Sequence, residues 1–439
     1  MEDLYQLFSN STGVTTDSRE AKKGQLFFAL RKEKIDGNQF AQKALEQGCS
    51  YAIIDNPVYF DKNDNRYILV DNAYEELKEL AKKHRSKFDI PFIGITGTCG
   101  KTTTKELVAA VLKQKYNVLY TYGNYNDELG VVLTLLSLTN EHELAVLEIG
   151  ALEINGIAPL VELVKPQYGI ITNIGKAHLQ GYGSVENVIK TKGYLYDYLK
   201  NISNSLIFYH EDDNILSKML IDRKITKTVS YSTENNPHSV VCGETVSNKK
   251  FVEIEWYRND SPDSRYKVNT HLVGSYNLPN LMAAISVGVY FNISPKEISE
   301  ALESYLPTNN RSQLQQTDNN ILIIDTYNAN PKSMKAALDN FCEFECQDGF
   351  EKMLILGDMK ELGESSSIEH KRIVDFLIES DFNNVWLVGE EFSKVNSPFR
   401  KFKNVEEVKN TLLSEKVIHS TILIKGSNST RLFELPDYL

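Results

Sequence analysis

Residues 92–107 read FIGITGTCGKTTTKEL, and this stretch decides the fold of the chain. The apolar run FIGIT predicts a buried strand, and the residues from about Thr103 to Lys113 predict a helix with an apolar face. Between them, glycines let the backbone approach a phosphate closely, while N–H groups and the positive helix N-terminus face the anion. Lys101 can reach terminal phosphates, and the Thr102 hydroxyl can ligate Mg²⁺. The segment therefore predicts a P-loop within a parallel α/β sheet.

The spacing of the glycines departs from the usual P-loop pattern. In G-x-x-x-x-G-K-[ST] a glycine would stand where this chain has Ile95, and the chain instead carries Gly94 and Gly97. An ordinary strand–turn–helix is the alternative, but the strand and helix that the motif requires are both predicted. A P-loop alone leaves kinases, GTPases, ATPases and ligases open, and no NKxD-like motif supports a GTPase. The predicted ATP contacts in this loop are Gly97, Thr98, Cys99, Gly100, Lys101, Thr102 and Thr103.

Composition and charge narrow the class of protein. The net charge of -11 over 439 residues argues against a protein that binds nucleic acid by neutralising phosphates. The start, MEDLYQLFSNSTGV, lacks the pattern of a signal peptide, and no apolar run approaches the ~20 residues that span a bilayer. The five cysteines form no CxxC pair, which favours free thiols in a reducing compartment. We therefore expect a cytoplasmic protein without nucleic-acid binding or stable membrane insertion.

Strand and helix patterns predict an α/β fold of three domains. These are a small N-terminal α/β domain over 1–86, a central P-loop ATPase-like parallel-sheet domain over 87–306, and a C-terminal Rossmann-like domain over 307–439. Short β-like runs between about 204 and 272 predict a β-rich extension of the central domain. The other predicted strands lie over 24–30, 51–56, 67–72, 92–96, 145–150, 168–175, 321–325, 353–358, 385–389 and 421–426, and the helices over 40–48, 75–85, 103–113, 277–291 and 331–341.

Two segments in the last domain carry a resemblance to a known family. DTYNANP (325–331) is followed by LGDMKELG (356–363), and with the P-loop they resemble the Mur ligases over about residues 12–435. Within that family, the pair resembles the members that add D-alanyl-D-alanine. The resemblance implies an ATP-dependent, ADP-forming ligase that joins UDP-N-acetylmuramoyl-tripeptide to D-Ala-D-Ala through an acyl phosphate, in peptidoglycan precursor synthesis. It also implies two Mg²⁺ ions, and we expect a monomer.

The first domain resembles the part of the family that holds the UDP end of the substrate. TDSR (16–19), LFFAL (26–30) and Asp36-Gly37 carry this resemblance. On chemistry alone, Ser18 and Arg19 suit an anionic ligand, although a turn with a surface arginine is the simpler alternative. GNYNDELG (123–130) resembles an Asn-rich family loop that lines the substrate and metal region. The implied substrate contacts are Ser18, Arg19, Asp36, Gly37, Asn124 and Asn126.

Three residues join Thr102 as candidate magnesium ligands. Glu148 ends the strand AVLEIG, and a carboxylate there, near a P-loop, suits Mg²⁺, with a simple strand end as an equal alternative. The resemblance implies that His178 contacts metal and that Lys192 carries an N-carbamate, which is a carboxylate-like ligand. A lone histidine after a strand is more often structural, and a surface lysine on a helix is the alternative for Lys192. Because an unperturbed lysine has a pKa of ~10.4, burial or metal binding must favour the modified form.

The remaining candidates surround the nucleotide and the amine acceptor. GSYNLPNLMAA (274–284) resembles the family's adenine segment, in which Asn277 and Asn280 offer amide groups to a purine, with a helix cap as the alternative. Arg311 resembles the arginine that reaches the γ-phosphate after domain closure, and Asp325 would take the ribose. The resemblance implies acceptor and active-site contacts at Asn328, Asn330, Lys425 and Ser427, and catalytic roles for Lys101, His178, Lys192 and Arg311.

Departures from the family pattern keep two alternatives open. They lie at Asp127, Leu152, Glu153, Tyr194 and Asn428. One alternative is a related ligase with another amine acceptor, such as a folylpolyglutamate synthase-like enzyme, and DTYNANP with the UDP-like first domain argues against it. The other is a non-catalytic nucleotide-binding regulator derived from the ligases, and the retained P-loop and candidate metal ligands argue against that.

Overall fold

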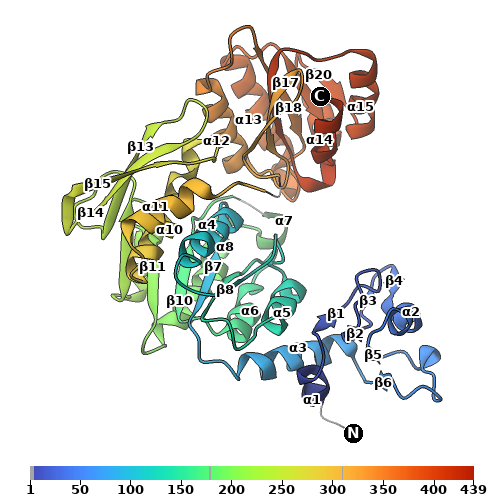
Figure 1. Cartoon of the computed structure of the whole chain (residues 1–439). Helices are drawn as coiled ribbons and strands as arrows, with labels where there is room; N and C mark the ends of the chain where they lie inside the picture. The colour runs from blue at the N-terminus through green and yellow to red at the C-terminus, as the bar shows by residue number, and fades with distance from the viewer. Residues whose placement is uncertain (1–3, 177–178, 309) are drawn as a thin grey trace.

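The computed structural model describes residues 4–176, 179–308 and 310–439, which form three α/β units in chain order (Figure 1). This arrangement confirms the predicted fold class. The domain limits that we predicted from the sequence, 1–86, 87–306 and 307–439, stay predictions. Across the ranges that the structure describes, no helix is both long and apolar enough to cross a bilayer.

The N-terminal unit is a small sheet with the strand order β1-β2-β5-β6, and every neighbouring pair is parallel. The alternation of strand and helix in the sequence predicts this pairing. A short antiparallel ribbon of β3 and β4 precedes Gly37. The bounds are α1 Leu4–Ser9, β1 Val14–Thr15, β2 Leu26–Phe28, β3 Arg31–Lys32, β4 Ile35–Asp36, α2 Ala41–Glu46, β5 Tyr51–Ile54, β6 Tyr67–Leu69 and α3 Ala73–Arg85.

The central unit is a nine-stranded sheet in the order β15-β14-β13-β12-β11-β10-β7-β9-β8. All pairs from β8 to β13 are parallel, whereas β14 pairs antiparallel with β13 and β15. The predicted β-rich extension is therefore a continuation of the same sheet. The strand bounds are β7 Phe92–Thr96, β8 Val118–Tyr120, β9 Leu144–Glu148, β10 Tyr168–Ile171, β11 Leu206–His210, β12 Thr228–Ser232, β13 Val241–Ser247, β14 Glu253–Arg258 and β15 Ser261–Asn269.

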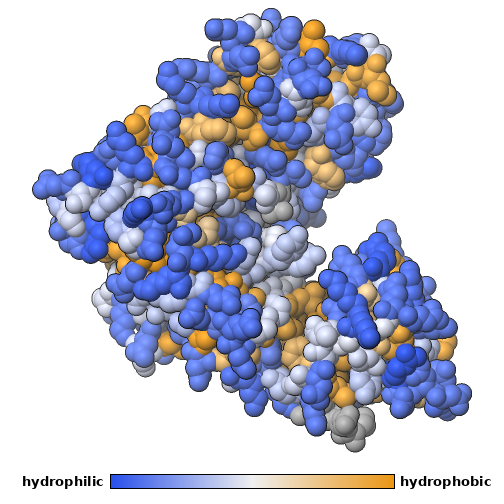
Figure 2. All heavy atoms as spheres, viewed as in Figure 1, coloured by the Kyte–Doolittle hydropathy of each residue, from blue (hydrophilic) through white to orange (hydrophobic). Residues whose placement is uncertain are grey.

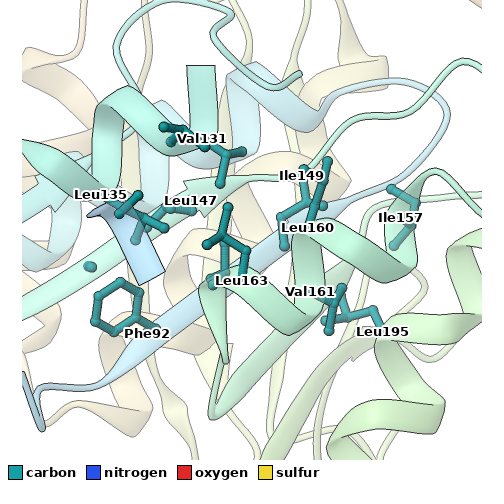
Figure 3. Packing of buried hydrophobic residues seen from close by; sticks show 14 of the residues in the cluster. Phe92, Val131, Leu135, Leu147, Ile149, Ile157, Leu160, Val161, Leu163 and Leu195 are labelled. Carbon is teal, nitrogen blue, oxygen red and sulfur yellow. The ribbon is translucent and has the colours of Figure 1, made fainter. Parts of the chain in front are cut away.

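Helices cover both faces of the central sheet, which explains why β7 is apolar throughout. Phe92 lies in the core that includes Leu135 of α5 and Leu195 of α8 (Figure 3). Ile93 and Ile95 belong to the core on the other face, with α4 and α10. The bounds are α4 Lys101–Leu112, α5 Glu128–Leu136, α6 Ile157–Val164, α7 Leu179–Tyr182, α8 Val185–Lys200, α9 Asn214–Arg223, α10 Leu278–Tyr290 and α11 Pro295–Ser304.

Helix α3 connects the N-terminal sheet to the central unit (Figure 1). Its buried residue Leu77 belongs to the same hydrophobic core as α5. The Tyr74 hydroxyl donates to the Glu128 carboxylate at the start of α5, over 2.7 Å. At the other end, the Arg85 guanidinium donates to the Val164 carbonyl over 2.8 Å. The helix is thus fixed against the central unit at both ends.

The C-terminal unit is a six-stranded sheet in the order β16-β17-β21-β18-β19-β20. Only β16 is antiparallel, and the four predicted strands are its central members β17, β18, β19 and β21. The sequence analysis missed the edge strands β16 and β20, which are short and mostly polar. The bounds are β16 Gln313–Gln316, β17 Asn320–Asp325, α12 Pro331–Glu343, β18 Glu351–Gly357, α13 Ser366–Glu379, β19 Val385–Val388, α14 Glu390–Lys394, β20 Arg400–Phe402, α15 Val405–Ser414 and β21 Ser420–Lys425.

Candidate active site

The carboxyl ends of parallel strands from two units surround a cavity of about 1450 Å³. Ligands of α/β folds bind at this edge, where loops and helix N-termini converge. Figure 2 shows a mostly hydrophilic surface with a hollow between the C-terminal and N-terminal lobes, whereas the residues that line the cavity come from the central and C-terminal units. The predicted residues that line the cavity are Thr98, Cys99, Gly100, Lys101, Thr102, Thr103, Asn124, Asn126, Glu148, Asn277, Asn280, Arg311, Asp325, Asn328, Asn330, Lys425 and Ser427.

The P-loop glycines are required by close contacts as well as by backbone shape. Gly100 has a φ of 78° and immediately precedes α4, and a Cβ there would lie 2.5 Å from the Asn280 Oδ1. Gly97 has a φ of 146°, and a Cβ there would lie 2.0 Å from the Thr172 Oγ1. A larger residue would displace these neighbours. The N–H groups in the first turn of α4 have no intrahelical partners, so this turn suits a phosphate.

Thr172 and Asn173, which follow β10, hold the tip of the P-loop, and the sequence analysis missed this role. The Thr172 hydroxyl donates to the Cys99 carbonyl over 2.6 Å. The Asn173 side chain accepts from the Cys99 N–H at 3.1 Å and donates to the Cys99 carbonyl at 3.0 Å. The signal in the sequence is a pair of polar residues after the buried run YGII, because ends of neighbouring parallel strands meet at one edge.

Glu148 is fully buried at the end of β9, and both oxygens of its carboxylate have partners. The Thr102 hydroxyl donates to Oε2 over 2.7 Å, and the Asn126 amide donates to Oε1 over 2.6 Å. A hydroxyl beside a carboxylate matches the oxygen ligands that Mg²⁺ takes, with phosphate and water filling its other positions. Among the described residues, no group of three or more His, Cys, Asp and Glu side chains could hold a metal alone. The residues therefore fit a magnesium ion that is shared with a phosphate ligand.

The loop over 121–126 is held by Lys105, a residue that the sequence analysis did not single out. This side chain is fully buried in α4, and its ammonium donates to the carbonyls of Thr121, over 2.6 Å, and Gly123, over 3.0 Å. It also pairs with the Glu106 carboxylate at 2.5 Å. Burial lowers the pKa of Lys105, and the negative charge of Glu106 opposes that shift. The lysine thus fixes the loop that carries both asparagines predicted to contact substrate.

Lys192 is buried in α8, so the surface-lysine alternative is wrong for this side chain. Burial and the positive charge of Lys101 lower the pKa of Lys192 to about 7. Burial also lowers the pKa of Lys101, and the charge of Glu148 acts in the other direction. Lys192 and Gly97 do not line the cavity itself. The predicted metal contact His178 lies outside the described residues.

Asn277, which directly precedes α10, and Asn280, in its first turn, are buried and bind each other. The Asn280 amide donates to the Asn277 Oδ1 over 3.0 Å, and the Thr104 hydroxyl donates to the Asn280 Oδ1 over 3.1 Å. Asn277 also donates to the Val273 carbonyl at 3.0 Å. These bonds connect α10 to the P-loop helix. The predicted adenine contacts of the two residues stay a prediction.

The C-terminal wall of the cavity brings together residues that are far apart in the chain. Lys425 at the end of β21 donates to Asp325 at the end of β17 over 2.5 Å, and to the Asn328 carbonyl over 3.3 Å. The Ser427 hydroxyl accepts from the Lys360 N–H over 3.0 Å. This bond connects the segment KGS (425–427) to the segment LGDMKELG (356–363). This wall also reaches the P-loop. The Asn330 amide donates to the Cys99 sulfur over 3.3 Å.

Comparison with known families agrees with this arrangement. The Mur ligase family catalytic domain matches residues 10–85, the Mur ligase middle domain matches 95–288, and the Mur ligase glutamate ligase domain matches 310–428. The chain is 34% identical over 380 residues to the UDP-N-acetylmuramoyl-tripeptide--D-alanyl-D-alanine ligase of Bacillus subtilis (strain 168), over 86% of this chain and 80% of that one. The chain belongs to the Mur ligase family.

Further Mur ligases are similar over nearly the whole chain. A ligase of the same name from Buchnera aphidicola subsp. Baizongia pistaciae (strain Bp) is 32% identical, over 95% of this chain and 90% of that one. The crystal structure of MurF from Acinetobacter baumannii superposes with a TM-score of 0.83 at 26% identity, over 98% of this chain and 97% of that one. These matches confirm the resemblance to the Mur ligases.

The residues that we predicted for the UDP end of a Mur ligase substrate lie in the N-terminal unit and do not line the cavity. Arg19 is exposed and bonds Asp17 at 2.5 Å, which lowers the pKa of Asp17 to about 2. Ser18 is buried. Asp36 accepts from the Asn38 amide over 2.6 Å, and a Cβ at Gly37 would lie 2.4 Å from the Leu30 carbonyl oxygen. Their contacts with UDP stay predictions.

Four of the five departures from the Mur ligase pattern line the cavity, and Tyr194 does not. Asp127 caps α5 by accepting from the Gly130 N–H over 2.8 Å, and Tyr194 bonds Glu162 at the surface over 2.8 Å. The cap is a structural role, and the Tyr194 bond lies away from the cavity. The departures that line the cavity are Asp127, Leu152, Glu153 and Asn428.

Proposed function

We propose that this chain is an ATP-dependent, ADP-forming ligase that adds D-alanyl-D-alanine to UDP-N-acetylmuramoyl-tripeptide in peptidoglycan precursor synthesis. The observation that carries the proposal is the single cavity that joins the P-loop, Glu148 and the segments DTYNANP and KGS. The names of the most similar relatives support this choice of substrate and acceptor.

The reaction needs two displacements. The terminal carboxylate of the tripeptide attacks the γ-phosphorus of ATP, which forms an acyl phosphate and releases ADP. The amine of D-Ala-D-Ala then attacks the acyl carbon, loses a proton and expels inorganic phosphate. Lys101 and Arg311, both on the cavity wall, would offset the charge on the transferred phosphoryl group.

Magnesium would bind at the paired oxygens of Thr102 and Glu148, with His178 and an N-carbamate on Lys192 as the proposed ligands of a second ion. Such ions withdraw charge from the phosphate oxygens and orient them. Carbamate formation requires a neutral amine that attacks CO₂. The low pKa of the buried Lys192, about 7, supports this role because much of the amine is neutral at physiological pH.

Each of the three units would bind a different ligand of the reaction. The N-terminal unit would hold UDP through Ser18, Arg19, Asp36 and Gly37, the central unit ATP, and the C-terminal unit the acceptor. Adenine would contact Asn277 and Asn280, and the ribose would contact Asp325. Closure of the C-terminal unit over the cavity would exclude water that hydrolyses the acyl phosphate.

Phosphate release with ATP, Mg²⁺ and UDP-N-acetylmuramoyl-tripeptide, with and without D-Ala-D-Ala, tests the proposal. We expect sustained release of ADP and phosphate only with D-Ala-D-Ala, and near loss of activity in Lys101→Ala. Glutamate and single amino acids serve as competing acceptors. Turnover with one of these instead would identify a related ligase, and ATP binding without any turnover would identify a regulator.

A further inference from the structure

Arg311 lies in the connector between the central and C-terminal units, and its side chain has an unusual environment. The guanidinium carbon lies 3.8 Å from the centroid of the Tyr327 ring, within the DTYNANP segment. The Nε of Arg311 is buried and has no hydrogen-bond partner among the described residues. A planar guanidinium prefers to stack flat on an aromatic face. Tyr327 thus restricts the plane in which the terminal N–H groups of Arg311 can point.

The backbone on both sides of Arg311 is left-handed, with a φ of 55° at Asn310 and 47° at Ser312. Asparagine tolerates this region, whereas serine seldom adopts it, so the strain lies at Ser312. Such conformations persist where surrounding contacts fix them. The Thr326 N–H donates to the Asn310 carbonyl over 3.0 Å. The Tyr276 and Ser312 hydroxyls are bonded at 2.9 Å.

These contacts come from two different units. Tyr276 precedes α10 in the central unit, next to the predicted adenine contact Asn277, whereas Thr326 and Tyr327 follow β17 in the C-terminal unit. Tyr276, Arg311 and Tyr327 all line the cavity. The position of Arg311 therefore depends on both units at once.

We propose that Tyr327 and Tyr276 are positioning residues that hold the Arg311 guanidinium toward the transferred phosphoryl group. This inference rests on the proposed ATP-dependent ligase reaction. Tyr327 fixes the plane of the guanidinium, and Tyr276 fixes the backbone at Ser312. A guanidinium aimed before the reaction begins stabilises charge that grows in the transition state, so the loss of either contact lowers kcat more than it raises KM.

Steady-state kinetics of Tyr327→Leu, Arg311→Ala and their combination test this role. We expect Tyr327→Leu to lower kcat roughly 10- to 100-fold, since misplacement by about 1 Å costs that much, with KM for D-Ala-D-Ala within about threefold. In the Arg311→Ala background, Tyr327→Leu should have no further effect. Tyr327→Phe keeps the ring and should retain more activity than Tyr327→Leu. If Tyr327→Leu lowered kcat by the same factor in the wild-type and in the Arg311→Ala protein, the proposal would be overturned.

A second pair of variants makes smaller changes and tests the same role if Tyr327→Leu fails to fold. Tyr276→Phe and Ser312→Ala each remove one side of a single hydrogen bond, so we expect equal decreases in kcat, roughly two- to tenfold, without additivity. Tyr257→Leu is the matched control. It removes another arginine–tyrosine stack, with Arg265 at 4.5 Å, in β14 and outside the cavity, and should leave kcat unchanged. Additive decreases in kcat when Tyr276→Phe and Ser312→Ala are combined would contradict a role through their shared hydrogen bond.

Nucleotide binding separates this inference from the proposed ligase function. Arg311 should make the protein bind a non-hydrolysable ATP analogue more tightly than ADP, as measured by titration calorimetry with Mg²⁺. Tyr327→Leu and Arg311→Ala should lose this preference to the same extent. If the wild-type protein lacks turnover but shows this pattern, the ligase proposal fails, whereas Tyr327 still positions Arg311 against the γ-phosphate of the bound nucleotide. A preference that survives in Tyr327→Leu would overturn the positioning role.

Discussion

The ammonium of Lys425 lies 2.5 Å from the carboxylate of Asp325, at the carboxyl ends of β21 and β17, where both residues line the cavity. The two residues are direct partners on the neighbouring parallel strands β17 and β21. Only 1% of the Lys425 side chain and 15% of the Asp325 side chain are exposed. The residue proposed for the ATP ribose is thus paired with the residue proposed for the acceptor.

Lys425→Met should therefore destabilise the protein. The change keeps the length of the side chain but leaves the Asp325 carboxylate without its cation. We expect the free energy of unfolding to fall by about 3 kcal/mol, at the lower end for a broken buried pair because Asp325 keeps some exposure. Urea unfolding followed by circular dichroism measures the difference.

Lys335→Met is the matched control for this experiment. Lys335 pairs with Asp339 on the surface of α12, with about half of each side chain exposed. Its loss should cost less than about 1 kcal/mol. The double change Asp325→Asn with Lys425→Met should cost less than the sum of the single changes. Equal effects of Lys425→Met and Lys335→Met would contradict a buried ion pair.

Lys105→Met should affect both stability and turnover. Its loss leaves the carbonyls of Thr121 and Gly123 without a donor, which we expect to lower the free energy of unfolding by about 2 kcal/mol. The loosened loop carries Asn126, a partner of Glu148, so kcat should fall roughly tenfold. Urea unfolding and phosphate release measure the two effects.

The control for Lys105 is Lys113, which directly follows the last residue of α4. Lys113 is exposed and its ammonium lies 3.8 Å from the centroid of the Tyr120 ring, which Lys105 also approaches. Lys113→Met should change neither kcat nor, beyond about 0.5 kcal/mol, the stability. A Lys105→Met protein that is destabilised but fully active would show that the loop does not position Glu148.

The sequence predicted the sheets well because their central strands are buried on both faces. Runs such as FIGIT, ILIID and TILIKG are apolar throughout, and parallel strands of this kind need no alternation. Helix α9 escaped prediction because its stretch, NILSKMLIDR, has a weak apolar stripe between polar residues. The P-loop was placed at its strand–helix junction since that motif is local.

The contacts within the candidate site were harder to predict because they join distant parts of the chain. Asp325 and Lys425 are separated by 100 positions, and each was assigned to a different ligand. Lys105 did carry a local signal, since it precedes Val108 and Leu112 on the apolar face of α4. A charged residue at such a position indicates a buried partner. No local pattern indicated that Tyr327 stacks on Arg311.

Removal of magnesium should abolish phosphate release, and Glu148→Gln should raise the Mg²⁺ concentration needed for half-maximal activity by roughly tenfold or more. An amide is a weaker ligand than a carboxylate, and its NH₂ group would face either the Thr102 hydroxyl or the Asn126 amide. Activity after chelation and back-titration with Mg²⁺ measures this requirement.

Glu143→Gln is the corresponding control. Glu143 immediately precedes β9, at the opposite end of the strand from Glu148, and it is exposed. Its replacement should leave the Mg²⁺ requirement at the wild-type value. If Glu148→Gln also left the Mg²⁺ requirement at the wild-type value, the Glu148 carboxylate would be excluded as a metal ligand.

His370 should make the stability depend on pH below neutrality. Its Nε2 accepts from the Met359 N–H at 3.0 Å, and its Nδ1 donates to the Ser366 carbonyl at 2.8 Å, so these bonds require the neutral ring. Burial lowers its pKa below the ordinary 6.5, although the charges of Asp358 and Glu391 oppose the shift and Lys360 adds to it. The unfolded chain therefore binds the proton more readily. Stability should be constant well above pH 6.5 and fall as the pH drops below it.

The slope from this one residue cannot exceed about 1.4 kcal/mol per pH unit. Urea unfolding at pH 7.5, 6.5, 5.5 and 5.0 measures it. His370→Gln should be less stable than the wild type at pH 7.5, yet its stability should fall less steeply between pH 6.5 and 5.0. His238→Gln, at an exposed position, should keep the wild-type slope. Buried His84, whose pKa is also lowered by burial, leaves a residual slope in every variant, so only the difference between the two variants reports on His370. Identical slopes for the two variants would mean that the His370 ring is protonated as readily in the folded protein as in the unfolded chain.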